Sequence, residues 1–234
     1  MTAIFRRELG SYFSSPIGYI FLAAFYVFSG FYFFVGSLLQ KSADLTYVFS
    51  SLFPVVLFLI PILTMRLLSE ERRHKTDQAL LTAPISLTAL VLGKFLSAVA
   101  VYGMALSVTL VYGVVIEALS ATDWVLLFGN FIALLLLGMA LISIGLFISS
   151  LTESQIIAAI GGFSVALLLL LVDAVRSVFS SPLIAGVIDA VSFYDRYSTF
   201  TVGIFDFSNV VFFFSVCVVF LFLTVRVFDR RRWG

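Results

Sequence analysis

The chain has 234 residues, of which 62% are hydrophobic and only 12% are charged, and its formal net charge is +1. Soluble domains carry about 25% charged residues, and a single soluble core of this length could not bury so much apolar surface, so a soluble globular fold is excluded. One cysteine, Cys217, and one histidine, His74, exclude a disulfide framework and a cysteine–histidine metal site. The composition predicts an integral membrane protein.

Residues 1–16 place apolar side chains at helical spacing and charged side chains on the opposite face. Phe5 belongs to the apolar face, whereas Arg6, Arg7 and Glu8 belong to the charged one. This pattern predicts a short amphipathic helix in the inner membrane interface. The alternative is the charged flank of an uncleaved signal anchor, because the apolar run that follows is too long for a signal peptide.

Six apolar stretches recur along the chain, and each is close to the roughly 20 residues that a helix needs to cross the hydrocarbon. Backbone amides in lipid must be hydrogen-bonded within their own segment, so each stretch is expected to be a helix. The sequence thus predicts a single all-α transmembrane domain over residues 1–234. Its predicted spans are residues 17–39, 45–66, 87–116, 124–151, 156–173 and 208–228.

The distribution of lysine and arginine predicts the orientation of these spans. If the N-terminus is inside, eleven of the fourteen basic residues lie on the inner side, and only Lys41, Arg176 and Arg196 lie outside. Basic residues accumulate on the cytoplasmic side of membrane proteins. Both termini are therefore expected in the cytoplasm, which agrees with an even number of spans.

The segment between the second and third spans, residues 69–84, is the most polar part of the chain. Ser69 is a suitable N-cap, with Glu70 and Glu71 in the first turn of the helix that would follow, and Pro84 would end that helix. We expect a short cytoplasmic helix suited to docking on a soluble partner. An ordinary solvated loop is the alternative.

The outer segment, residues 174–207, is long for a plain connection and rich in aromatic residues. Together with the short fifth span and its Gly161–Gly162 pair, it suggests a broken, re-entrant hairpin that could form an outer gate, because irregular backbone at that depth must lie against protein or water. An interfacial aromatic belt without a gating role is the alternative.

Several catalytic motifs are missing from the sequence. It has no GxxxxGK[ST] loop for ATP, no GxSxG, no HExxH and no paired carboxylates within the spans. Mid-span polar residues are few, and Thr109, Asn130 and Ser143 are more typical of helix packing than of substrate binding. We therefore expect a non-catalytic membrane subunit that binds no metal, cofactor or nucleic acid and whose energy comes from outside the chain.

Three motifs together resemble the permease subunits of ABC transporters of the type-2 export class. The first is the inner loop EERRHKTDQALLTAPIS followed by LVLGKFL, in which Gly93 and Lys94 open the third span. The second is the N-terminus FRRELGSYFSSPIGYIF, and the third is the outer segment YDRYSTFTVGIFDFSNVVFF. The subgroup most similar is the permease associated with bacterial gliding motility, although that subgroup often has a histidine at the position of Arg196.

The resemblance implies a bacterial inner-membrane (plasma-membrane) permease that pairs with a second permease copy or paralogue and with two separate ATPase subunits, which bind the ATP and magnesium. An additional envelope protein is a further expected partner. The inner loop would be the coupling helix that rests in a groove of the ATPase. The implied coupling residues are Glu70, Glu71, Arg72, Arg73, Thr76, Leu80, Leu81 and Pro84. The outer-gate candidates are Gly161, Gly162, Tyr197, Phe200, Gly203 and Asp206.

Three functions are compatible with the sequence. The leading hypothesis is the transmembrane subunit of an ATP-driven exporter, with a hydrophobic or amphipathic cargo because the spans offer almost no charged lining. A membrane adaptor that transmits the force of an ATPase and moves no substrate is the main alternative. A stand-alone carrier or channel, which would work without an ATPase, is the third.

Overall fold

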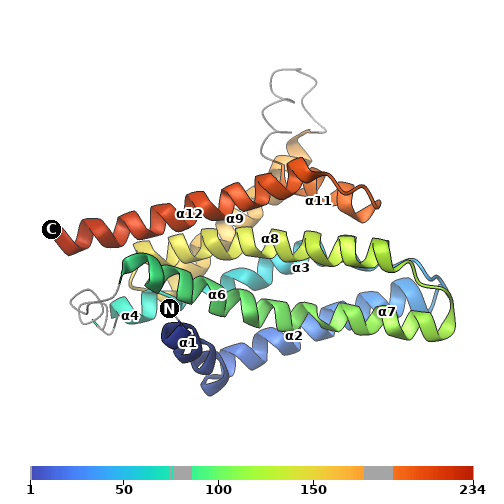
Figure 1. Ribbon diagram of the computed structural model, residues 1–234, viewed down its shortest axis with the longest axis horizontal. Helices are drawn as coiled ribbons and strands as arrows, with labels where there is room; N and C mark the ends of the chain where they lie inside the picture. Colours follow the sequence, from blue (N-terminus) through green and yellow to red (C-terminus); the bar gives the residue numbers. More distant parts are fainter. Residues whose placement is uncertain (1, 74, 76–85, 177–191, 234) are drawn as a thin grey trace.

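The computed structural model of the protein describes residues 2–73, 75, 86–176 and 192–233 (Figure 1). This part of the chain folds into helices joined by turns and contains no strand. Six helical segments are long and apolar enough to cross a membrane, so the predicted all-α membrane fold is confirmed. These segments are Pro16–Leu38, Thr46–Arg73, Leu87–Leu119, Trp124–Leu151, Gln155–Val172 and Phe207–Arg230.

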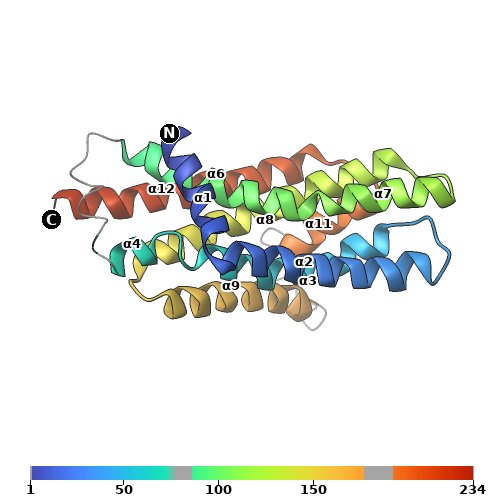
Figure 2. The same cartoon turned by 90° about the horizontal axis from the view of Figure 1, so that it is seen from below.

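Helix α1 (Thr2–Ser14) lies across the direction of the long helices, as Figure 2 shows, and contacts α2 and α6. Helix α2 (Pro16–Phe33) starts with a proline, whose missing N–H is tolerated in a first turn. It continues into the π-helical turn η1 (Phe34–Leu38). The chain thus turns sharply at Ser15 from a crosswise helix into the first span.

The second and third spans are both built from two helices. The second consists of α3 (Thr46–Thr64), a turn and the short α4 (Ser69–Arg73). The third consists of α6 (Leu87–Leu106) and α7 (Val108–Leu119). Ser86 caps α6, because its Oγ accepts a hydrogen bond from the amide of Ala89 at 3.4 Å.

Helix α8 (Trp124–Leu151) lies at the centre of the bundle and contacts α3, α6, α7, α9, α11 and α12. Glycines on this helix permit close approach of its neighbours. A Cβ at Gly138 would overlap the ring of Tyr102, and one at Gly145 would overlap the side chain of Thr64. At these two glycines, the backbone of α8 therefore lies directly against side chains of α6 and α3.

Helix α9 (Gln155–Arg176) corrects one expectation from the sequence. It is continuous through Gly161 and Gly162, so this pair does not interrupt the fifth span, whereas residues 177–191 of the predicted re-entrant hairpin lie outside the described residues. Instead, a Cβ at Gly161 would come within 2.8 Å of Ile148, and one at Gly162 would come within 2.8 Å of Pro61. The pair therefore serves the close packing of α9 on α8 and α3.

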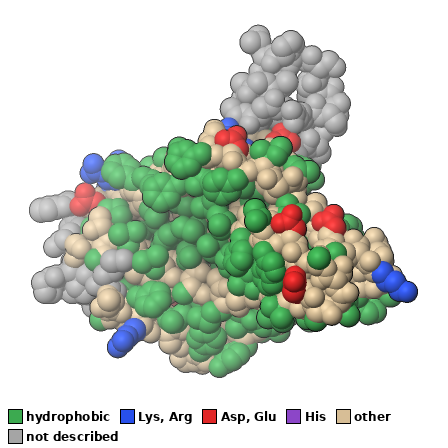
Figure 3. Space-filling view, turned by 45° about the vertical axis from the view of Figure 1, so that its right-hand side comes forward, with side chains coloured by type: hydrophobic (Ala, Val, Ile, Leu, Met, Phe, Trp, Pro, Cys, Tyr) green, Lys and Arg blue, Asp and Glu red, His purple; other side chains and the backbone are tan. Residues whose placement is uncertain are grey.

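Two helices complete the fold. The short α11 (Phe193–Thr201) precedes α12 (Phe207–Trp233), the last span. The N-terminus and the C-terminus lie at the same end of the bundle, which we call the terminal side and which also holds α1 and α4 (Figure 1). The opposite end, with the connection from α7 to α8, is the distal side. Between the two ends the surface carries many apolar side chains (Figure 3), as a membrane requires.

Candidate coupling site

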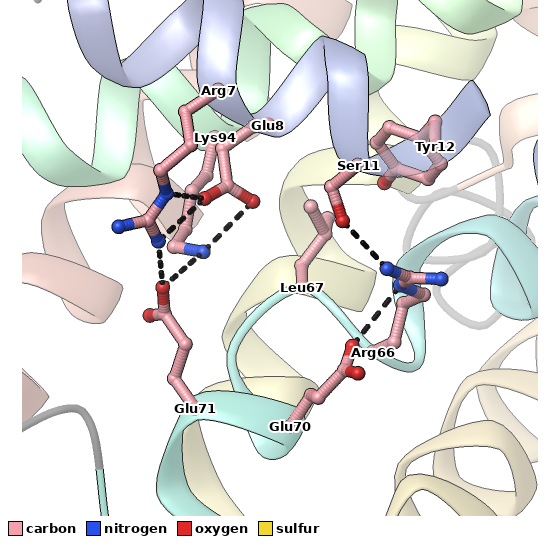
Figure 4. A pocket seen from close by; sticks show the side chains of 9 residues that line it. All are labelled: Arg7, Glu8, Ser11, Tyr12, Arg66, Leu67, Glu70, Glu71 and Lys94. Atoms are coloured by element: carbon pink, nitrogen blue, oxygen red, sulfur yellow. Dashed lines mark hydrogen bonds and ion pairs between the residues drawn. The ribbon is translucent and has the colours of Figure 1, made fainter. Parts of the chain in front are cut away.

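Four charged side chains join α1, α4 and α6 at the terminal side (Figure 4). The Lys94 ammonium lies 3.0 Å from Glu8 Oε2 and 2.9 Å from Glu71 Oε1. The Arg7 guanidinium lies 3.0 Å from Glu8 Oε1 and 2.8 Å from Glu71 Oε1. Each cation thus bridges both carboxylates. We call Arg7, Glu8, Glu71 and Lys94 the coupling cluster.

Burial decides which member of the cluster contributes most. The side chain of Lys94 is 1% exposed and those of Glu8 and Glu71 are 11% and 12% exposed, whereas Arg7 is 60% exposed. A buried ammonium loses its hydration and needs close carboxylates to offset that cost. An exposed guanidinium keeps its water and is screened by salt. The contact of Lys94 with Glu8 and Glu71 is therefore the centre of the cluster.

A glycine next to Lys94 lets α1 come close enough for this contact. A Cβ at Gly93 would lie 2.9 Å from Cγ2 of Ile4 and 3.6 Å from the backbone nitrogen of Phe5. Gly93 and Lys94, the Gly-Lys pair of the sequence motif, thus each have a structural role. Gly93 admits the backbone of α1, and Lys94 pairs with the carboxylate that α1 brings.

Arg66 forms a second connection between α1 and the start of α4. Its guanidinium lies 3.1 Å from Glu70 Oε2 and donates hydrogen bonds to Ser11 Oγ at 2.7 Å and Ser15 Oγ at 2.5 Å. It also lies over the ring of Tyr12, 5.8 Å from its centroid. Arg66 therefore holds the last turn of α1 and the turn at Ser15 against the end of the second span.

Tyr12 also fixes the last turn of α1, through a contact with α3. Its phenol donates a hydrogen bond to the carbonyl oxygen of Leu63 at 3.1 Å. Burial raises the pKa of Tyr12 well above its usual value, so the phenol stays protonated and keeps donating at physiological pH.

The turn between α3 and α4 is held by Ser149 of α8. Ser149 Oγ accepts hydrogen bonds from the amides of Leu68 at 3.1 Å and Ser69 at 3.0 Å, and lies 3.2 Å from the Met65 carbonyl oxygen, to which it donates. Beyond this turn, Arg72 lies 3.2 Å from Glu153. Helix α4 is thus connected to α8 as well as to α1 and α6.

The cluster surrounds a cavity of about 240 Å³. The polar side chains around it pair largely with one another, as the dashed lines in Figure 4 show, so the arrangement is that of a joint between helices. The lining residues are Arg7, Glu8, Ser11, Tyr12, Arg66, Leu67, Glu70, Glu71 and Lys94.

The predicted coupling and interfacial residues fall into three groups. Helix α4 contains Glu70, Glu71, Arg72 and Arg73. Helix α1 contains the interfacial residues, of which Arg7 and Glu8 enter the cluster, whereas Arg6 is exposed and Phe5 is half-buried. The remaining coupling residues, Thr76, Leu80, Leu81 and Pro84, lie outside the described residues.

Four of the six gate candidates lie in or beside α11. The Tyr197 phenol donates to the carbonyl oxygen of Phe49 at 2.8 Å, and Phe200 packs edge-on against Phe205. Gly203 has φ +84°, a conformation that favours glycine, and Asp206 Oδ1 accepts from the amide of Ser208 at 2.8 Å. These contacts make a packed corner between α11 and α12.

The other two gate candidates do not join this corner. Gly161 and Gly162 lie within the first three turns of α9, which starts at Gln155 on the terminal side, and their close neighbours are Ile148 and Pro61. The structure therefore does not bring the six gate residues together. A role in gating stays a prediction for the four near α11.

Sequence reasoning found Lys94 and Glu71 but missed the pairing of Lys94 with Glu8. A signal for it was available. A lysine inside an apolar span requires a carboxylate nearby, and Glu8 lies on a helix that the sequence places at the same inner membrane interface as Lys94. The hydrogen bonds of Ser149 had no comparable signal, because serine is common in spans.

The fold and this site define a multi-pass membrane subunit whose short terminal-side helices are tied by buried ion pairs to its spans. The sequence model of the family described as ABC-2 family transporter protein matches residues 43–233. That match covers most of the chain, so the protein belongs to the ABC-2 transporter family and is a permease subunit of an ABC transporter. No curated protein matches the chain. Helices α1 and α2 precede the matched residues, so the Glu8 side of the coupling cluster lies outside the match.

Proposed function

We propose that this permease is the transmembrane subunit of an exporter and that a separate ATPase drives it through α4. The observation that carries the proposal is the buried Lys94, whose ammonium contacts Glu8 of α1 and Glu71 of α4 at once. A displacement of α4 by a bound ATPase would move the two carboxylates and Lys94 together. The motion would thus reach the interfacial helix α1 and the third span.

The contacts of α4 suit it to this task. It is five residues long, so its own helical hydrogen bonds contribute little and its position depends on its neighbours. Ion pairs reach from it to α1, to α6 and to Glu153 between α8 and α9. A push on α4 would therefore be distributed over four spans rather than absorbed by one loop.

The partners follow from the family. A permease of this family works with an ATPase, and we propose two ATPase subunits and a second permease copy or paralogue, with the terminal side in the cytoplasm of a bacterial cell. An accessory envelope protein and a place in the gliding-motility subgroup remain predictions from the sequence. ATP and magnesium would bind to the ATPase.

The cargo that fits the chain best is hydrophobic or amphipathic. Among the described residues, the buried charged side chains are Glu8 and Lys94, and both belong to the coupling cluster. The spans offer no buried charge to a polar ion elsewhere in that part of the chain. Stimulation of ATP hydrolysis by a strongly charged hydrophilic solute alone would contradict this assignment.

An adaptor that moves no substrate is the second candidate, and the packing of the single chain favours it in one respect. Phe21 and Phe25 of α2 and Phe49 and Phe53 of α3 are almost fully buried inside the single chain. An exporter would then need its path between two permease copies. Transport of a fluorescent lipid or peptide into vesicles by the purified complex separates the two functions, because an adaptor would hydrolyse ATP without moving any cargo.

The coupling step itself is tested with an environment-sensitive dye on Gly10→Cys, which is exposed on α1 and has no neighbour within 4 Å of the added Cβ. The background is Cys217→Ala, and the complex with the ATPase is used. We expect ATP to change the dye emission with the cluster intact. In Lys94→Met the ATPase should stay bound and active while the dye signal falls at least severalfold. An undiminished signal in Lys94→Met would overturn the proposed force path.

A further inference from the structure

We propose that a pocket on the distal side binds an elongated organic cation, with its ammonium group at the mouth and a hydrogen-bonding group at the inner end. The cavity measures about 240 Å³ and lies where the start of α3, the connection from α7 to α8 and the start of α8 meet. We call it the distal pocket. Its lining residues are Ala43, Asp44, Leu45, Ala121, Thr122, Asp123, Leu126, Leu127 and Asn130.

Asn130 is the observation that points to a ligand. Its side chain is fully buried, and neither its amide nitrogen nor its amide oxygen has a hydrogen-bond partner among the described residues. Buried amides are nearly always hydrogen-bonded, because an apolar environment offers no substitute for water. Asn130 is among the residues that line the distal pocket, so we infer that a molecule entering the pocket from its mouth supplies the missing partner of the amide.

The mouth of the pocket is acidic. Asp44 Oδ1 accepts a hydrogen bond from the amide of Thr46 at 2.8 Å, and Asp123 Oδ1 accepts from the amides of Val125 and Leu126 at 3.1 Å each. These bonds fix both carboxylates at helix starts and leave their charge facing solvent. Glu117, whose Oε2 accepts from the amide of Thr122 at 2.9 Å, adds a third carboxylate beside the mouth.

One basic group lies nearby and limits the acidic field. Lys41 lines the neighbouring cavity, which shares Ala43 with the distal pocket. One lysine against three carboxylates leaves the mouth negative. A cation is therefore favoured there over an anion.

Asp123 at the mouth and Asn130 at the inner end are too far apart to bind one metal ion together. Asn130 follows Asp123 by seven residues on α8, so it lies about 10 Å deeper at the helical rise of about 1.5 Å per residue. Metal–oxygen bonds are about 2–2.6 Å long. The apolar side chains of Leu126 and Leu127 line the pocket between the two ends. A chain molecule with a charged end, an apolar middle and a hydroxyl or amide end satisfies all three parts.

The test uses 6-amino-1-hexanol as the probe and the full purified chain in lipid nanodiscs, without an ATPase. Ligand-observed NMR titrations compare it with hexylamine, which lacks the hydroxyl, and 1-hexanol, which lacks the ammonium. We expect saturable binding of the amino alcohol, and binding at least about fivefold weaker for each of the other two, the loss expected for one hydrogen bond or more.

Two variants locate the binding. Asn130→Leu keeps the branched shape of the side chain and removes the amide, and Asp123→Asn keeps the helix cap and removes the charge. Asn130→Leu should abolish the preference for the amino alcohol over hexylamine, and Asp123→Asn should weaken both amines. Ser164→Ala, an exposed change on α9, is the control and should change nothing. If wild type binds no amino alcohol saturably, or binds it as tightly after Asn130→Leu, the proposal is overturned. Because no ATPase is used, the result is independent of the proposed coupling.

Discussion

Lys94 carries a charge into the third span, where burial disfavours it, and Glu8 and Glu71 offset that cost at 3.0 and 2.9 Å. Such a pair stabilises the fold less than its short distances suggest, because all three groups have lost water. Removing one member of this contact has a larger effect on stability than the contact itself contributes. Removing one partner leaves the others buried without their counter-charge, so the cluster is sensitive to single substitutions.

Lys94→Met should therefore be among the most destabilising changes at the terminal side. We expect a loss of about 3–5 kcal/mol, the range for removing one partner of a buried ion pair. A thermal unfolding scan in detergent measures it, with the buried thiol of Cys217 as a reporter of unfolding.

The matched comparison is Arg7→Ala, which removes the other cation of the same cluster. Arg7 is 60% exposed, so its loss should cost less than about 1 kcal/mol. If Lys94→Met and Arg7→Ala lowered the free energy of unfolding by the same amount, burial would not explain which of the two contacts matters more.

At the scale of the element, α1 is placed by its contacts rather than by its own helical propensity. Its thirteen residues lie across the bundle and pack on Gly93 of α6, with Arg66 and the Leu63 carbonyl fixing its last turn. An isolated helix of this length is marginal in water. The position of α1 should thus respond to changes on α6 and α3.

Gly93→Ala tests this dependence, because the new Cβ would lie 2.9 Å from Cγ2 of Ile4. We expect α1 to shift away from α6, which would lengthen the contact between Glu8 and Lys94 and raise proteolysis at α1. Gly10→Ala is the control, because nothing lies within 4 Å of its added Cβ. It should be neutral or slightly stabilising, since alanine favours a helix over glycine.

Helix α4 offers a second test through Ser149→Ala. This change leaves the amides of Leu68 and Ser69 without their acceptor, and each unsatisfied buried amide costs about 1–3 kcal/mol. We expect faster hydrogen exchange at these amides and a lower thermal midpoint. Ser97→Ala is the control, because Ser97 bonds to the Lys94 carbonyl of its own helix. Similar exchange in both variants would contradict the role of Ser149.

The elements were largely predictable from the sequence, and their contacts were not. Spans follow from local hydrophobicity, and the six candidate spans of the structure overlap the six predicted stretches, although the second continues to Arg73. The Gly161–Gly162 pair contributed to the prediction of a broken hairpin but lies in a continuous helix, because glycine composition does not distinguish a kink from close packing against Ile148 and Pro61. The pairing of Lys94 with Glu8 depends on how α1 folds back onto α6, which no local pattern encodes.

At the scale of the whole molecule, both termini lie at one end of the bundle (Figure 1), and the basic residues predict that this end faces the cytoplasm. Cysteine labelling tests the orientation in a Cys217→Ala background. Ser120→Cys is exposed on the distal side and Gly10→Cys on the terminal side. A membrane-impermeant maleimide should label Ser120→Cys in intact cells, and Gly10→Cys only after permeabilisation. The reverse pattern would invert the topology.

The central claim is that this permease works with a separate ATPase that acts on α4. The most direct measurement is affinity purification of the tagged chain from the membranes of its own host, with quantification of any bound subunit that carries an ATP-binding P-loop and of its ATP hydrolysis. We predict about one ATPase subunit per permease chain, as the paired arrangement implies. A chain that purifies without an ATPase and still moves solutes in liposomes would contradict the account.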